Sequence, residues 1–201
     1  MVIRLENNEW KKRKVRRVSY RAVLREGVTE EQAESAFLLC REAFVRAKES
    51  YVLLTASLYR YGKYLFLYAE GAGEEPLPEK LCAALADLLQ NWPGPVEEPR
   101  CGRMWVRMQP YYYHAVPDTA EDWMKDRNPS LRRGRIALLL PDKWESYMAH
   151  HFALMREGLI EGDRYHLISL HENLLFSYFE EPKTLTNLQR KEAGHSAALE
   201  E

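Results

Sequence analysis

The sequence predicts an α+β protein in which one structural unit occurs twice. Strand-like runs rich in β-branched and aromatic residues alternate with amphipathic helical patterns, and the order strand, helix, strand, strand appears in both halves. A short stretch of the first half also recurs at the matching place in the second half. Hydrophobic residues make up 46% and charged residues 29% of the 201 residues, a balance typical of a globular chain with a packed core.

Six elements are expected in the first half, in the order βαββαβ. Thr29 and Gln32 have the spacing of a capping box, and apolar residues recur behind them at helical spacing. Gly62 suits a hairpin turn because it adopts positive φ, and Pro78 suits the first position of a helix. The expected elements are a strand at 18–24, a helix at 29–48, strands at 51–59 and 64–70, a helix at 78–89 and a strand at 103–113.

The second half repeats the order βαββ after a connection in which prolines and charged residues break the periodicity. We expect a strand at 135–140, a helix at 143–156 and a hairpin of strands at 165–170 and 174–179. The polar residues from 183 onward predict no fourth strand, and we expect residues 1–5 to fill the open edge. The predicted division is a first unit at 1–114, a connection at 115–134 and a second unit at 135–201.

The repeat is visible in residues as well as in element order. Residues 65–70 (LFLYAE) match residues 175–180 (LFSYFE), and Glu34-Ser35 matches Glu145-Ser146 at an offset that differs by one residue. Both matches fall in register with the expected elements, which favours two tandem ferredoxin-like units. We expect their sheets to pack together as an intramolecular version of a dimeric α+β barrel, with self-association through exposed edges as a further option.

Cysteine spacing, hydrophobic runs and missing motifs narrow the cellular location and the classes of enzyme to consider. Cys40, Cys82 and Cys101 form no CxxC pair, so we expect reduced thiols. No apolar run approaches the about 18 residues that cross a membrane, and no N-terminal stretch reads as a leader, so we expect a cytoplasmic protein without membrane association. The chain has no GxGxxG, P-loop, HExxH or GxSxG motif, and we expect neither a metal nor a cofactor.

A basic segment at residues 11–17 stands out against a net charge of −1. Such runs can bind phosphate backbones or anionic lipid. No nucleic-acid motif follows it, so a solvated lead into the first strand is favoured over nucleic-acid binding.

Tyr147 and His151 are the strongest candidates for chemistry. They lie four residues apart on the expected second-half helix, so a phenol and an imidazole share one face. Histidine transfers protons near neutral pH, and such acid/base help contributes about 10²–10⁴-fold in rate. Packing against a sheet is the plainer role for such a histidine, but the first-half helix has Ala36 and Cys40 at the equivalent positions. The fold itself therefore does not demand the pair.

Aromatic side chains supply further candidates for ligand binding. The run Tyr111-Tyr112-Tyr113-His114 ends the fourth strand, where strict alternation would place Tyr111 and Tyr113 on one face and Tyr112 and His114 on the other. Trp123 and His166 are weaker candidates, because a single Trp in a connection or His on a strand usually packs. The expected substrate-binding residues are Tyr113, His114, Trp144 and Tyr165.

The pattern formed by Tyr147, His151, the run 173–176 (NLLF) and Glu180 resembles that of the L-rhamnose mutarotase family of dimeric α+β barrel proteins. The resemblance covers about 50 residues, from 134 to 181. Family members continue from the histidine with Asn-Pro, where this sequence has Phe-Ala.

The resemblance implies a reaction and roles for two residues. His151 would be the acid/base residue that opens and recloses a pyranose ring and so interconverts its anomers, and Tyr147 would bind a sugar hydroxyl. The ligand would be a small molecule, a monosaccharide, and the reaction would need no metal or cofactor.

Two other readings remain open. One is a haem- or aromatic-ligand-binding barrel in which His151 or His114 is an iron ligand. The other is a non-enzymatic regulatory or scaffold module whose basic segment binds a partner.

Overall fold

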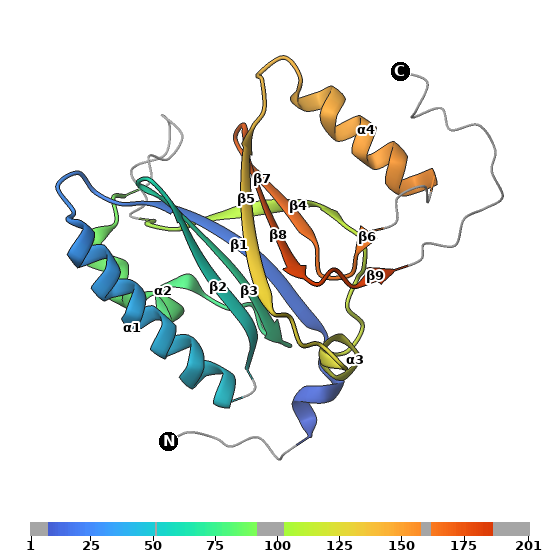
Figure 1. Ribbon diagram of the computed structural model, residues 1–201, viewed down its shortest axis with the longest axis horizontal. Coiled ribbons are helices and arrows are strands. Elements are labelled where there is room, and N and C mark those ends of the chain that lie inside the picture. The colour runs from blue at the N-terminus through green and yellow to red at the C-terminus, as the bar shows by residue number, and fades with distance from the viewer. Residues whose placement is uncertain (1–7, 51, 92–102, 158–161, 187–201) are drawn as a thin grey trace. The chain divides into compact units, whose positions relative to one another are not determined.

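The computed structural model describes residues 8–50, 52–91, 103–157 and 162–186 (Figure 1). The chain forms two compact units, and the boundary runs through strand β4 (Val106–Tyr113). Unit 1 comprises residues Met1–Met108 and Pro117–Arg127, and unit 2 comprises Gln109–Val116 and Asn128–Glu201. The division differs from the expected one because part of the predicted connection folds into unit 1 and the end of β4 belongs to unit 2.

Unit 1 is an antiparallel sheet with helices. Its strands are hydrogen-bonded in the order β2-β3-β1-β4, and β4 pairs with β1 through residues 106–108. The elements other than β4 are η1 (Glu9–Lys12, a 3-10 helix), β1 (Val15–Val23), α1 (Glu30–Glu49), β2 (Leu53–Tyr61), β3 (Tyr64–Ala72), α2 (Pro78–Leu81), η2 (Ala83–Leu88, a 3-10 helix) and α3 (Ala120–Met124).

Helix α1 follows from its local sequence. The Thr29 side chain accepts a hydrogen bond from the Gln32 backbone amide, and the Gln32 side chain accepts one from the Thr29 amide. This capping box satisfies two backbone donors that the helix itself leaves unpaired. The apolar stripe that includes Ala36 and Cys40 is buried in the core of unit 1. The predicted helix is confirmed.

The helix predicted at 78–89 is wrong as one continuous element. Helix α2 ends at Leu81, since Cys82 leaves helical geometry with φ −120° and ψ 32°, and the chain continues as the 3-10 helix η2. Leu81 and Leu85 are both buried, and Leu89 then forms a bridge with Leu24 beside β1. Pairing with the sheet thus pulls the chain into an extended form, which local propensity could not reveal.

Unit 2 is an antiparallel sheet with one helix. Its strands follow the order β4-β7-β8-β5, with β4 pairing through residues 109–113, and a separate two-stranded ribbon joins β6 to β9. The elements other than β4 are β5 (Leu131–Leu138), α4 (Trp144–Glu157), β6 (Gly162–Asp163), β7 (Leu167–His171), β8 (Leu174–Glu181) and β9 (Leu185–Thr186).

The helix and the hairpin expected in the second half are confirmed to within two residues. The strand expected at 135–140 begins four residues earlier and ends at Leu138, and β6 and β9 were not predicted. Glu172 takes φ 56° in the turn between β7 and β8, where the hairpin turn was expected. The strand expected at residues 1–5 lies outside the described residues, as does the tail from 187 onward. No helix among the described residues is both long and apolar enough to span a membrane.

The repeated sequence occupies matching strands and builds a similar buried contact in each unit. In β3 of unit 1 the Tyr68 hydroxyl donates to the carboxylate of Glu70, and in β8 of unit 2 the Tyr178 hydroxyl donates to that of Glu180 at 2.5 Å. All four side chains are buried. The two halves therefore share a sequence and also the polar contact that it forms.

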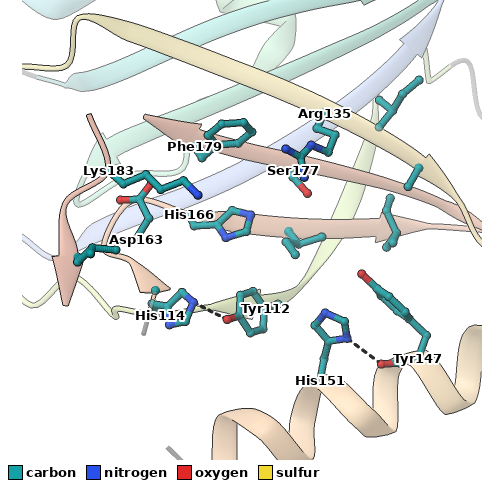
Figure 2. A pocket seen from close by; sticks show the side chains of 16 residues that line it. Tyr112, His114, Arg135, Tyr147, His151, Asp163, His166, Ser177, Phe179 and Lys183 are labelled. Carbon is teal, nitrogen blue, oxygen red and sulfur yellow. Dashed lines mark hydrogen bonds between the residues drawn. The ribbon is translucent and has the colours of Figure 1, made fainter. Parts of the chain in front are cut away.

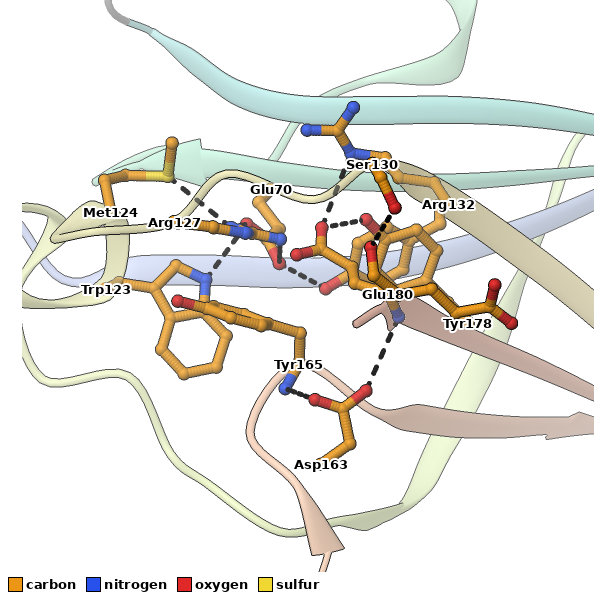
Figure 3. Close-up of polar contacts among 12 residues, drawn as sticks. Glu70, Trp123, Met124, Arg127, Ser130, Arg132, Asp163, Tyr165, Tyr178 and Glu180 are labelled. Atoms are coloured by element: carbon orange, nitrogen blue, oxygen red, sulfur yellow. Dashed lines mark hydrogen bonds and ion pairs between the residues drawn. The ribbon is translucent and has the colours of Figure 1, made fainter. Parts of the chain in front are cut away.

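In unit 1 the buried carboxylate of Glu70 is surrounded by donors (Figure 3). The Arg127 guanidinium donates at 2.6 Å and 3.2 Å, and the Trp123 indole donates at 3.0 Å. The Arg17 guanidinium lies 3.8 Å away. Burial alone would raise the pKa of Glu70. The charges of Arg127 and Arg17, with the hydrogen bonds that Arg127 and Tyr68 donate, instead leave that pKa lowered. The carboxylate is thus ionised, and it ties the segment that carries α3 to β3.

Candidate functional site

A pocket of about 470 Å³ lies in unit 2 between α4 and the sheet (Figure 2). Its walls come from α4, from β4, β5, β7 and β8, and from the β6 and β9 region. Strand alternation on β8 sends Leu175, Ser177 and Phe179 into the pocket. Tyr178 and Glu180 alternate with these residues on β8, so they point to the opposite face of the sheet. We call this space the α4 pocket.

Helix α4 presents Tyr147 and His151 to the pocket, as the spacing predicted. Their rings lie 4.2 Å apart between centroids, and both side chains are partly buried. The Nδ1 atom of His151 lies 3.0 Å from the backbone carbonyl oxygen of Tyr147. A carbonyl oxygen only accepts hydrogen bonds, so Nδ1 carries the proton, and Nε2 of the neutral ring carries a lone pair. The helix backbone thereby sets the tautomer needed for a base.

Strand β4 brings two neighbouring tyrosines to the same histidine. The register of β4 against β7 shifts between Pro110 and Tyr112, as at a β-bulge. The rings of Tyr111 and Tyr112 both pack edge-on to His151, at 6.0 Å and 5.6 Å between centroids. The prediction of strict alternation is therefore wrong for Tyr111, because the register shift at this point interrupts the two-residue period.

Tyr112 and His114 form a hydrogen-bonded pair inside the pocket. Burial, together with nearby Tyr147, raises the pKa of Tyr112 to about 12, so its phenol keeps its proton at neutral pH. Burial also lowers the pKa of His114, although the charge of Asp163 opposes this. A neutral imidazole then accepts at Nε2 from the Tyr112 hydroxyl (Figure 2). The pair is a fixed, uncharged polar wall.

Asp163 and His166 complete the polar lining. The two carboxylate oxygens of Asp163 accept from the backbone amides of Tyr165, at 3.2 Å, and Glu180, at 3.4 Å. Asp163 therefore holds the chain after β6 against β8. The His166 ring stacks 6.5 Å from that of His114 and packs edge-on to Tyr112.

The structure brings together three of the six residues predicted for the site, namely Tyr147, His151 and His114. The other three do not line the α4 pocket. Tyr113 is exposed on β4, and Trp144 is exposed at the start of α4. Tyr165 is buried beside Asp163 with its ring outside the pocket lining. Trp123, a weaker candidate, belongs to the Glu70 cluster of unit 1.

Several residues of the pocket were not among the six predicted for the site. Tyr112 was visible in the aromatic run, and its two-residue spacing from His114 was the available signal. Ser177 could have been found from the alternation of β8. The sequence did not indicate a role for Asp163, Arg135 or Lys183. They come to the same pocket only because β5, β6 and the end of β8 meet there.

The donor set is suited to holding a small polar ligand and moving a proton on it. No three His, Cys, Asp or Glu side chains within the described ranges are placed to hold a metal ion. Of the two histidines considered as iron ligands, His114 uses its Nε2 to bind Tyr112. Comparison with family models, curated proteins and solved structures finds no match to this chain.

Proposed function

We propose that unit 2 binds a monosaccharide in the α4 pocket and interconverts its anomers by acid/base chemistry. The observation that supports the proposal is the tautomer of His151. Its Nδ1 proton is held by the Tyr147 carbonyl oxygen, which leaves Nε2 as an acceptor on a side chain that lines the pocket. General base catalysis requires such an acceptor within reach of the proton that it removes.

The pocket has the size and lining that suit a small sugar. Its volume of about 470 Å³ lies within the range of about 300–1,000 Å³ usual for small-molecule sites. The aromatic rings of Tyr112 and Tyr147 lie in the lining and are suited to pack against the apolar side of a pyranose. Hydroxyl and imidazole groups of the lining offer hydrogen bonds to its hydroxyls.

In the proposed reaction, Nε2 of His151 takes the proton of the anomeric hydroxyl. A C=O double bond forms at C1 while the bond between C1 and the ring oxygen breaks, and the imidazolium returns its proton to that oxygen. Both oxygens are bonded to C1, so a single imidazole reaches both. Rotation about the C1–C2 bond and the reverse steps close the ring as the other anomer. Tyr147, beside His151, binds a sugar hydroxyl and orients the ring.

Saturation-transfer NMR on the whole protein tests this proposal. The exchange rate between α and β anomers is measured for L-rhamnose, L-fucose, ribose and galactose, with wild type and His151→Ala. We expect wild type to accelerate exchange of at least one sugar, and the variant to lose the acceleration. The matched control is His150→Ala, since His150 is the exposed neighbour on α4 and does not line the pocket. Equal acceleration by wild type and His151→Ala would refute the assignment of the base.

The strand orders support the finer fold proposed with this function, two tandem ferredoxin-like units. The order β2-β3-β1 around α1 in unit 1 has its counterpart in the order β7-β8-β5 around α4 in unit 2. In both, the strand before the helix pairs with the second strand of the following hairpin. Packing of the two sheets as one barrel stays a prediction.

A further inference from the structure

Three arginines lie on β5, and two of them have carboxylate partners. Arg132 lies 3.4 Å from Glu180, and Arg133 lies 2.9 Å from Glu181, both on β8. Arg135 differs from these two. It lines the α4 pocket, and the structure records no ion pair for it with any described residue. Its guanidinium lies 5.4 Å from the centre of the Phe179 ring instead.

Lys183 brings a second cation to the same end of the pocket. It follows β8 and lines the α4 pocket, again with no ion pair recorded among the described residues. Figure 2 shows Arg135, Phe179 and Lys183 toward one end and Tyr147 with His151 toward the other. The pocket therefore has a cationic end and a proton-transfer end.

Asp163 is the one acidic side chain among the described residues that line this pocket, and both of its oxygens accept backbone amides. Its charge is thus partly offset by those dipoles. With two cations and one such carboxylate in the lining, and His114 neutral, the potential at that end is positive. Arg135 and Lys183 are both exposed to solvent, so their charges act on a ligand that enters the pocket from that end.

We propose that the ligand of the α4 pocket carries an anionic oxygen group, a carboxylate or a phosphate, which Arg135 and Lys183 bind. The inference deepens the proposed function and rests on it for the sugar itself. Arg135 supplies a planar fork of donors that matches both groups, and the Phe179 face holds the guanidinium in place. The substrate class becomes a uronate or a sugar phosphate, with its anomeric carbon toward His151.

The test compares matched charged and neutral probes. Binding of D-galacturonate is measured against D-galactose, and glucose 6-phosphate against glucose, by calorimetry on the whole protein. A charge-assisted hydrogen bond contributes roughly 1.5–3 kcal/mol, so we expect the preferred anion to bind about tenfold or more tightly than its neutral partner. The first pair identifies a carboxylate ligand and the second a phosphate.

Variants assign the preference to the residues. Arg135→Gln should reduce the anion preference about tenfold or more, and Lys183→Gln should weaken it as well. Arg133→Gln is the control, because it removes the same charge from the same strand outside the pocket. It should keep the preference. Equal binding of charged and neutral probes, binding of neither, or a preference that survives in both Arg135→Gln and Lys183→Gln would overturn the proposal.

Anomer exchange measured on the same samples separates this inference from the proposed function. Anion-selective binding that needs Arg135, without accelerated exchange, would uphold the anion site and refute the mutarotase reaction. Accelerated exchange of neutral sugars without anion selectivity would uphold the mutarotase reaction and refute the anion site.

Discussion

Gly162 lies directly against the imidazole of His114, so closely that a β-carbon at this position would overlap the ring. Gly162 opens β6, the short strand that closes one side of the α4 pocket. The position is buried and requires the absence of a side chain, not an unusual φ. The His114 ring is thus hydrogen-bonded to Tyr112 on one side and lies against the backbone of Gly162 on the other.

Gly162→Ala should displace His114 and break its hydrogen bond with Tyr112. The added methyl group meets the ring itself, so either the imidazole or β6 must move. We expect a loss of about 1–3 kcal/mol in the free energy of unfolding, as for overpacked sites. Urea unfolding measures this loss, and the ring ¹⁵N shifts of His114 report its displacement. Unchanged shifts and stability would show that the two residues do not touch in solution.

Tyr112→Phe should remove the donor to His114 without changing the shape of the pocket. A neutral hydrogen bond contributes about 0.5–1.5 kcal/mol, and the unfolding free energy should fall by that amount. The His114 Nε2 resonance should move at the same time. Tyr113→Phe is the control, because Tyr113 is the exposed neighbour on β4. Equal effects of the two substitutions would contradict the assigned hydrogen bond.

The stability of the protein should fall as pH drops below about 6.5, the ordinary pKa of histidine. Burial lowers the pKa of His114 in the folded state, so between the lowered and ordinary values the unfolded chain binds more protons. Protonation then favours unfolding. Urea unfolding at several pH values should show the trend, and His114→Gln should reduce it. An NMR titration in which His114 protonates above its ordinary value would refute the prediction.

Glu70→Gln should destabilise the protein by about 3–5 kcal/mol, the cost of leaving a buried charge without its partner. Arg127 and Glu70 are both almost completely buried, so the guanidinium could not recover its hydration. Chemical unfolding measures the change. Glu181→Gln is the matched control on an exposed ion pair and should change stability by at most about 1 kcal/mol. A similar small loss for both variants would argue against a buried, ionised Glu70.

The sequence by itself determined the features that depend on neighbouring residues. The capping box that starts α1 and the helical spacing of Tyr147 and His151 need only local backbone geometry, and both are found as predicted. The repeat likewise predicted matching strands for 65–70 and 175–180. The capping box and the helical pair each lie within a few residues along the chain, and each copy of the repeat is a short run of neighbouring residues.

Only the tertiary structure decided which residues meet in the α4 pocket. Tyr111 contacts His151 beside a register shift in the pairing of β4 with β7, a strand far along the chain. Arg135 and Lys183 come together because β5 pairs with β8, and Gly162 reaches His114 only because β6 closes the pocket. Such contacts depend on strand pairings between distant segments, and the local periodicity of the sequence does not predict which segments pair.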